Sequence, residues 1–306
     1  MNLYNVDDER LTNLNITSHV IMNIEYFWTD ERVRRLCEAI QNLDDIQINL
    51  DLFQPRSCTQ ITDQCFQYFG NLMPTNLLEL SLNNWGNQNY NISDIAFIHL
   101  GKAFKNLKIL RLNLQQWGHK GCKISNIGVV QLFKSLPQQI QELELNLNKL
   151  GYRNQNITGH SFVAMGDFIE NLQNLKNLTL NLADWGNDYN RSLELFLNED
   201  LQYLIEKIFN LDLEKLHLDL TGLGMNGSKI TEESAFFLLQ HLQQTDIYDL
   251  NIILQGWICN VEVKNQILKM TKEKQQQKKY MYQLLAIKSL DVSTQDRILE
   301  EIFAKL

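Results

Sequence analysis

The stretch Leu110-Arg111-Leu112-Asn113-Leu114-Gln115-Gln116-Trp117-Gly118 decides how this chain folds. Leucines alternate with polar residues over most of its length, and a large apolar residue followed by glycine closes it. Alternation with a period of two is typical of a β-strand with one buried face. The same phrase recurs at Leu78 to Gly86, Leu143 to Gly151, Leu178 to Gly186 and Leu216 to Gly224, and looser copies start at Val20, Ile46 and Leu250.

The copies are spaced like the units of a repeat protein. If the first apolar residue of each copy is position 0, successive copies start 26, 32, 32, 33, 35, 38 and 34 residues apart. Positions 0, +2 and +4 are apolar almost throughout, and four of the five tryptophans stand at +7. Position +8 is glycine in five copies, which predicts a turn with positive φ there. We predict repeated strands whose leucines and +7 tryptophans are buried.

The second half of each unit has the pattern of a helix. A serine or threonine preceded by isoleucine comes about 15 residues after position 0, as in Ile92-Ser93 and Ile124-Ser125. A hydroxyl in that place caps a helix by accepting a hydrogen bond from an unpaired backbone amide. Apolar residues then follow at helical spacing, as Ala96, Phe97 and Leu100 do after Ser93. Each unit is therefore predicted to contain a strand, a turn, a helix and a return.

This phrase, L-x-x-L-x-L with a further apolar residue at +7, resembles the leucine-rich repeat, and the long helical units resemble the ribonuclease-inhibitor type. The resemblance implies a curved α/β solenoid of about eight repeats, with a parallel sheet on the concave side and helices on the convex side. It also implies an asparagine ladder at +5, but this sequence departs from that pattern. Position +5 is occupied by Glu25, Asp51, Asn83, Gln115, Asn148, Ala183, Thr221 and Gln255.

The ends of the chain differ from the repeats. We predict an N-terminal cap over residues 1–19, a solenoid over 20–260 and a helical cap or basic arm over 261–306. Residues Val261 to Ile287 have the pattern of one long helix, and Ser293 would cap a last helix. Such caps are expected because the last sheet edge and core of a solenoid must be covered.

Charge is distributed unevenly along the chain. The formal net charge is −8, which argues against a nucleic-acid-binding surface over the whole protein. The segment 261–288 carries seven lysines and two glutamates, a net +5, so the remainder carries −13. The lysines that we single out in this basic arm are Lys272, Lys274, Lys278 and Lys279. They either dock on an acidic surface, such as a microtubule, a nucleic acid or a nuclear import receptor, or form a solvated helix face.

Strand positions +1 and +3 point away from the leucines and are expected on the concave face. The candidate protein-binding residues are Glu79, Arg111, Glu144 and His217 at +1, and Asn113, Asn146 and Asp219 at +3. The asparagines at +3 have a second interpretation, because they could bond one another across the sheet as a structural row. Both interpretations stay open at this point.

No pattern in the sequence indicates catalysis. The five cysteines include no CxxC pair, the single close pair His119 and Cys122 supplies two ligands where zinc needs more, and no glycine-rich phosphate loop occurs. We therefore expect no enzyme activity, no cofactor and no metal. No apolar run approaches the roughly 20 residues of a membrane span, and we expect a cytoplasmic protein without membrane contact, a cytoskeletal or nuclear location being left open.

The function expected from these features is non-catalytic protein binding, as a scaffold or adaptor subunit that uses the concave sheet and the loops at its edges. A rigid curved sheet loses little entropy on binding because its side chains are held at fixed spacing. Two alternatives remain. Inhibitor-like and GTPase-activating relatives imply a regulator of an enzyme or GTPase, and the basic arm would suit a component of a cytoskeletal, axonemal or ribonucleoprotein complex.

Overall fold

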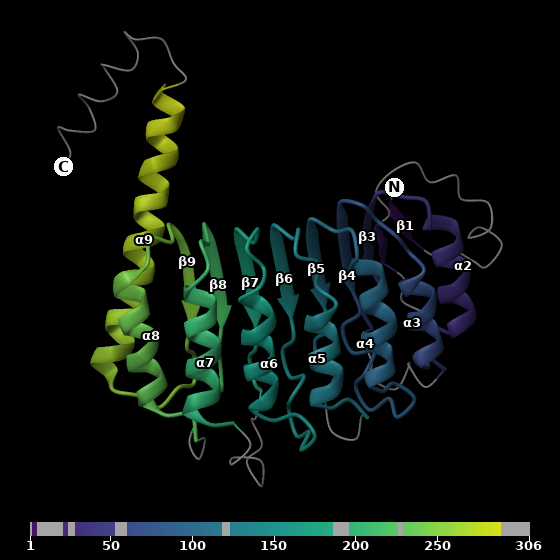
Figure 1. Ribbon diagram of the computed structural model, residues 1–306, viewed down its shortest axis with the longest axis horizontal. Coiled ribbons are helices and arrows are strands. Elements are labelled where there is room, and N and C mark those ends of the chain that lie inside the picture. The colour runs from purple at the N-terminus through teal and green to yellow at the C-terminus, as the bar shows by residue number, and fades with distance from the viewer. Residues whose placement is uncertain are drawn as a thin grey trace.

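The computed structural model describes residues 2–4, 21–23, 28–52, 60–117, 123–185, 196–225 and 229–288 of the 306-residue chain. Strands and helices alternate along these residues and form an open α/β solenoid (Figure 1). One parallel sheet of seven strands runs through it in chain order: β3 (Asp45–Asn49), β4 (Leu77–Ser81), β5 (Ile109–Asn113), β6 (Glu142–Asn146), β7 (Asn177–Asn181), β8 (Lys215–Asp219) and β9 (Asp249–Ile253).

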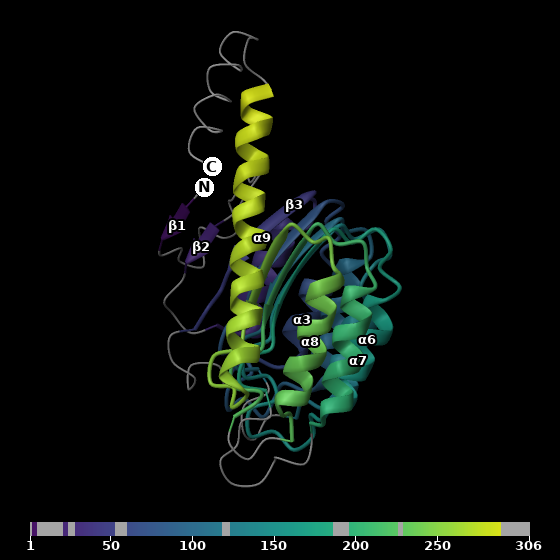
Figure 2. The same cartoon turned by 90° about the vertical axis from the view of Figure 1, so that its left-hand side faces the viewer.

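The helices of successive repeats lie side by side on one face of this sheet (Figures 1 and 2). They are α2 (Asp30–Ile40), α3 (Asp63–Gly70), α4 (Asp94–Leu100) with the short 3-10 helix η2 (Gly101–Phe104), α5 (Asn126–Lys134), α6 (His160–Ile169), α7 (Asn198–Phe209) and α8 (Glu232–Gln244). The predicted α/β solenoid, with a parallel sheet on one side and helices on the other, is confirmed.

The register of the sheet follows the repeat alignment. Each of the seven strands begins one residue before position 0, and equivalent positions pair, so that Leu78 lies opposite Leu110 and Leu110 opposite Leu143. The residues at 0, +2 and +4 are buried, as Leu110, Leu112 and Leu114 illustrate at 0–2% exposure. Stacking equal phrases in register therefore places the side chains at 0, +2 and +4 on the helix side of the sheet.

The tryptophans at +7 are buried, as predicted, and they also bond the repeats together. The indole Nε1–H of each donates to the backbone carbonyl of the +4 leucine one repeat earlier, at 2.5–2.7 Å. The four pairs are Trp85 with Leu50, Trp117 with Leu82, Trp185 with Leu147 and Trp257 with Leu220. This tryptophan ladder links neighbouring units.

The turn after each strand uses a different residue from the one expected. Positive φ occurs at +6 in six consecutive repeats: Asn84, Gln116, Lys149, Asp184, Gly222 and Gly256. The prediction of positive φ at the +8 glycines is therefore wrong for those described. Gly86 is required for close packing instead, because a Cβ there would lie 2.5 Å from the carbonyl oxygen of Trp117.

The predicted helix caps are present and form a second ladder between repeats. Thr62, Ser93 and Ser125 each cap their own helix with the side-chain hydroxyl oxygen. The same hydroxyl and the backbone N–H donate to a carboxylate on the first residue of the preceding helix, as Ser93 does to Asp63. Asn198 takes this role for Thr231, although its own unit has no capping serine or threonine.

Two elements flank the repeats. Strands β1 (Asn2–Tyr4) and β2 (Ile21–Asn23) form a separate parallel pair near β3, so the first copy lies outside the seven-stranded sheet. Helix α9 (Val261–Lys288) packs on β9 and α8 at the other end and continues past the edge where the strands begin (Figures 1 and 2). The long helix predicted over 261–287 is confirmed, whereas the last helix predicted after Ser293 lies outside the described residues.

Candidate functional site

The candidate site is the face of the sheet opposite helices α2–α8, which we call the strand face. It consists of the side chains at positions −1, +1 and +3 of strands β3–β9. Apart from Leu77, which is buried, all of these side chains are partly or fully exposed. Because the strands pair in register, equivalent positions form continuous rows across the sheet, with neighbouring strands about 4.8 Å apart. The strand face is therefore an ordered array of mostly polar side chains that are accessible to solvent.

Arg111 is the centre of a charged cluster on this face. Its guanidinium donates to Glu142 at 2.6 and 2.9 Å and to Glu79 at 3.2 Å, and its Nε lies 3.9 Å from Glu144. Burial alone would lower the pKa of Arg111. Its hydrogen bonds to Glu142 and Glu79, together with the negative charges of these residues, outweigh burial, so the pKa of Arg111 is raised. The cluster brings three predicted residues together on β4, β5 and β6. Glu79 and Glu144 keep 45% and 50% of their side chains exposed, so both carboxylates remain available.

Glu142 was not among the predicted residues, although it is the closest carboxylate to Arg111. It stands at −1, two residues before Glu144, and period-two alternation places both on one face. The sequence therefore contained the signal for Glu142. Extending the predicted rows to −1 also adds Asp45, Lys215 and Asp249 to the strand face.

The row at +3 has a structural task. The side-chain oxygens of Asn113, Asn146, Asn181 and Asp219 each accept a hydrogen bond from the backbone N–H two residues later, at 2.9–3.2 Å. These hydrogen bonds hold the backbone at the end of each strand and lead into the turn at +6. Asn113 also donates to the hydroxyl of Ser81 on the next strand at 2.8 Å. The side chains of these asparagines therefore bond mainly to the turns of their own repeats, and they remain partly exposed on the strand face.

His217 lies at the β8 end of the +1 row, next to Asn251 of β9, whose side-chain amide is 3.2 Å from Nδ1. Burial lowers the pKa of His217, and Lys215 acts in the same direction, while Asp219, Glu144 and Asp249 oppose them. The imidazole is therefore predominantly neutral at pH 7 and accepts a hydrogen bond. No second acid–base group is bonded to it among the described residues, so this arrangement gives no support for catalysis.

The strand face is acidic as a whole. Its carboxylates are Asp45, Glu79, Glu142, Glu144, Asp219 and Asp249, and its cations are Arg111 and Lys215, which gives a net charge of −4. Three of the carboxylates are concentrated around Arg111 on β4–β6. A surface of this kind attracts lysine and arginine side chains.

Lys272 and Lys274 of the basic arm, whose side chains the structure describes, have different surroundings. Lys274 donates to the backbone carbonyl of Thr245 at 2.8 Å and so ties α9 to the end of α8. Lys272 is exposed and points away from the buried side of α9, which contains Val263, Ile267 and Thr271. The side chains of Lys278 and Lys279 lie outside the described residues, although the helix backbone continues through both.

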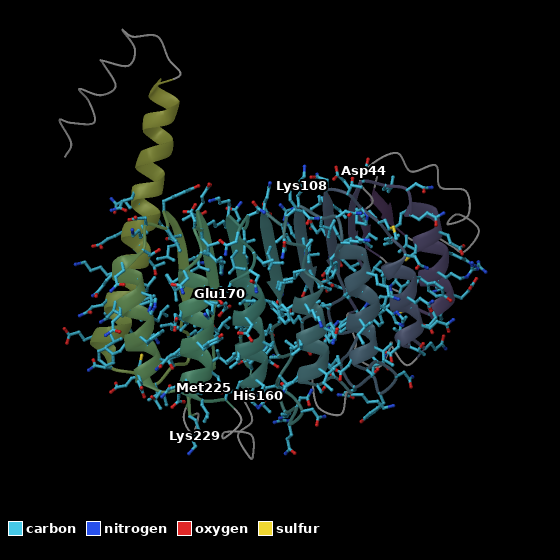
Figure 3. All side chains as sticks on the ribbon, in the orientation of Figure 1. Asp44, Lys108, His160, Glu170, Met225 and Lys229 are labelled. Atoms are coloured by element: carbon cyan, nitrogen blue, oxygen red, sulfur yellow. The ribbon has the colours of Figure 1, made fainter. Side chains whose placement is uncertain are left out.

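The loops at the two edges of the sheet flank the strand face. Asp44 and Lys108 lie along the edge where the strands begin, and His160, Met225 and Lys229 lie along the opposite edge (Figure 3). Asp44 accepts a hydrogen bond from the hydroxyl of Thr75 at 2.7 Å, which joins the loops that precede β3 and β4.

The described part of the chain contains no cluster of three or more His, Cys, Asp or Glu side chains placed to hold a metal ion. Among the same residues, no helix combines the length and apolarity that crossing a membrane requires. Burial raises the pKa of all three described thiols: well above the usual value at Cys65, and also at Cys37 and at the partly exposed Cys259.

Compared with known proteins, the chain matches no family model, and no curated protein is similar to it in sequence.

Proposed function

We propose that this protein is a non-catalytic binding module, a scaffold or adaptor subunit that holds a partner protein against the strand face and the adjacent edge loops. The observation that carries the proposal is the open strand face, where polar side chains stand in register across seven strands. The carboxylates of Glu79 and Glu144 are half exposed on it and held beside Arg111.

The physical argument is preorganisation. Two ladders of hydrogen bonds, from the +7 tryptophans and from the helix caps, fix each repeat on the one before it. Side chains on the strand face therefore hold their spacing before a partner arrives, and binding orders few additional groups. The charge of the face favours a partner with a basic surface, because opposite charges accelerate encounter and exclude acidic competitors.

We further propose that the repeats belong to the leucine-rich class, nearest to the ribonuclease-inhibitor type. The recurrent leucine phrase and the strand–turn–helix unit support this assignment. The tryptophan ladder and the unit length of 32 to 38 residues from Ile46 onward distinguish this chain from the regular pattern of that class.

The test is a comparison of captured partners. Tagged wild-type protein and the variant Glu79→Lys/Glu144→Lys are used to purify binding proteins from cells that express the chain, followed by quantitative mass spectrometry. The matched control is Glu199→Lys/Glu206→Lys, which makes the same charge change on exposed positions of α7.

The expected result is a set of proteins bound by the wild type and by the α7 control but lost from the strand-face variant. Equal capture by all three would refute the proposed role of the strand face. A circular dichroism melt of each variant verifies that the fold is retained.

A further inference from the structure

We propose that the outer side of α4 and α5 binds an amphipathic helix of a partner protein, one whose apolar stripe is bordered by acidic residues. We call this surface the α4–α5 patch. It consists of Ile95, Ile98, Lys102, Ile127, Val130 and Lys134. The patch lies on the helix layer, away from the strand face, so the inference goes beyond the proposed function and does not depend on it.

A comparison of equivalent helix positions identifies the patch. One solvent-facing position recurs in helices α2–α8, two residues after the residue that aligns with the capping Ser93. It is exposed in all seven helices and is occupied by Glu31, Gln64, Ile95, Ile127, His160, Glu199 and Glu233. Five of these helices have a polar side chain there, so the fold itself does not require an apolar one. In α4 and α5 the side chains are isoleucines that are 49% and 62% exposed.

The apolar surface continues along both helices. Ile98 and Val130 follow Ile95 and Ile127 by three residues, so they lie one turn further on the same side. Ile98 is 44% exposed and Val130 is partly exposed. The two helices therefore carry two short, matching rows of aliphatic side chains that face solvent.

The two rows lie close together because Gly128 lets α5 approach α4. A Cβ at Gly128 would lie 2.5 Å from a carboxylate oxygen of Asp94 and 2.7 Å from the ring of Phe97. Figure 1 shows α4 and α5 as neighbours in the helix layer. Rows of side chains on packed helices present ridges on which a further helix can lie.

The width of the patch favours a single helix as its occupant. The helices on either side carry exposed polar residues at the same position, Gln64 on α3 and His160 on α6. The apolar surface at this position is therefore two helices wide. A lipid surface spreading over the helix layer would also cover the polar side chains of α3 and α6.

Charge determines which kind of helix fits. Lys102 and Lys134 follow Ile98 and Val130 by four residues, and both lysines are exposed. Each helix thus presents two aliphatic side chains and then a lysine on the same side. A helix that covers the aliphatic rows brings its flanking residues near these lysines.

The carboxylate closest in sequence is already engaged. Residues 90–136 contain one acidic residue, Asp94, and its side chain accepts two hydrogen bonds from Ser125, at 2.6 and 2.7 Å. Carboxylates that face the two lysines must therefore come from the partner, which favours an acidic helix over a basic one.

The experiment measures binding of fluorescent synthetic peptides to the purified full chain by fluorescence anisotropy. The first peptide, about 18 residues long so that it can form a helix, has leucines at helical spacing flanked by glutamates. A second peptide has lysines in place of the glutamates, and a third has serines in place of the leucines. The wild type should bind the first peptide at least about tenfold more tightly than either of the others.

Variants locate the contact on the patch. Ile95→Gln/Ile127→Gln introduces the residue that α3 has at the equivalent position, and it should weaken binding of the first peptide by about tenfold or more. Phe236→Gln on α8 is the matched control, since Phe236 is an exposed apolar residue at 45%, and it should bind like the wild type. Lys102→Glu/Lys134→Glu should reverse the preference, so that the peptide with lysines binds more tightly than the peptide with glutamates.

Three outcomes would overturn the inference: equal binding of the three peptides, unchanged binding by Ile95→Gln/Ile127→Gln, or adsorption to phosphatidylserine vesicles by a protein that binds no peptide. The strand-face variant Glu79→Lys/Glu144→Lys should bind the first peptide like the wild type at about 150 mM salt, which screens charges on the opposite face. Failure of the proposed function and failure of this inference are thereby distinguished.

Discussion

The tryptophan ladder makes a quantitative prediction about stability. Trp117→Phe removes the donor of the 2.7 Å bond to the carbonyl of Leu82 but keeps an aromatic ring between Phe66 and Phe97, whose centroids lie 5.1 and 5.5 Å away. The Leu82 oxygen still accepts from the backbone N–H of Trp85 and is not left without a donor. The lost bond should therefore cost about 1 kcal/mol, the net value of an ordinary hydrogen bond.

The smaller phenyl ring adds a packing cost. Truncation of a buried tryptophan to alanine costs about 3–5 kcal/mol, and phenylalanine restores most of that contact, so roughly 1 kcal/mol remains. We expect Trp117→Phe to lower the free energy of unfolding by about 2 kcal/mol in total.

Trp28 provides a matched control. It is 2% exposed and packs against Trp85 at 6.0 Å, but its buried Nε1 has no hydrogen-bond partner in the described structure. Trp28→Phe makes the same chemical change without breaking a bond and also removes an unsatisfied donor, which is itself unfavourable. Its cost should be about 1 kcal/mol or less.

The assay is urea unfolding followed by circular dichroism and by fluorescence, with free energies taken from the midpoint and slope where the two transitions coincide. The difference between the two variants isolates the hydrogen bond. If Trp28→Phe destabilises the protein as much as Trp117→Phe does, the indole bond contributes nothing and the ladder is a consequence of packing alone.

Three further predictions concern the turn, the thiols and one histidine. Lys149 has a φ of 60°, a backbone conformation that costs a residue with a Cβ about 1–2 kcal/mol. Lys149→Gly removes this cost but adds the conformational entropy that glycine loses on folding, so the free energy of unfolding should rise by about 0.5 kcal/mol. A lower urea midpoint for Lys149→Gly than for the wild type would contradict this. In the native state at pH 8, iodoacetamide should label the partly exposed Cys259 more readily than the buried Cys37 and Cys65. Peptide mass spectrometry measures the labelling of each cysteine. Equal labelling of all three would be inconsistent with the fold. Burial lowers the pKa of His217 below its value in the unfolded chain. The unfolded state therefore binds the proton first, and the stability of the protein should fall as the pH drops through about 6.5. In thermal melts, His217→Gln should lose less stability over that pH range than the wild type, and an unchanged pH profile would refute the assignment.

The strand face illustrates how far local patterns extend toward a site. Alternation placed Glu79, Arg111 and Glu144 on one face, and the repeat alignment placed them in one row. The same reasoning omitted Glu142, because the predicted rows stopped at +1. Sequence reasoning also left open whether the asparagines at +3 bind a partner or have a structural role. Their hydrogen bond to a backbone amide two residues later depends on turn geometry, which residue type alone does not fix.

The sequence by itself determined which residues form strands, which leucines and tryptophans are buried and how neighbouring strands align. Those properties follow from periods of two and of about 33 residues, which are local or repeated features of the chain. Tertiary structure alone decided that Trp117 bonds to Leu82, that Ser93 bonds to Asp63, and that positive φ falls at +6. The physical reason is that a side chain finds its partner in the next repeat, about 30 residues away, through distances and angles that exist after the units have stacked.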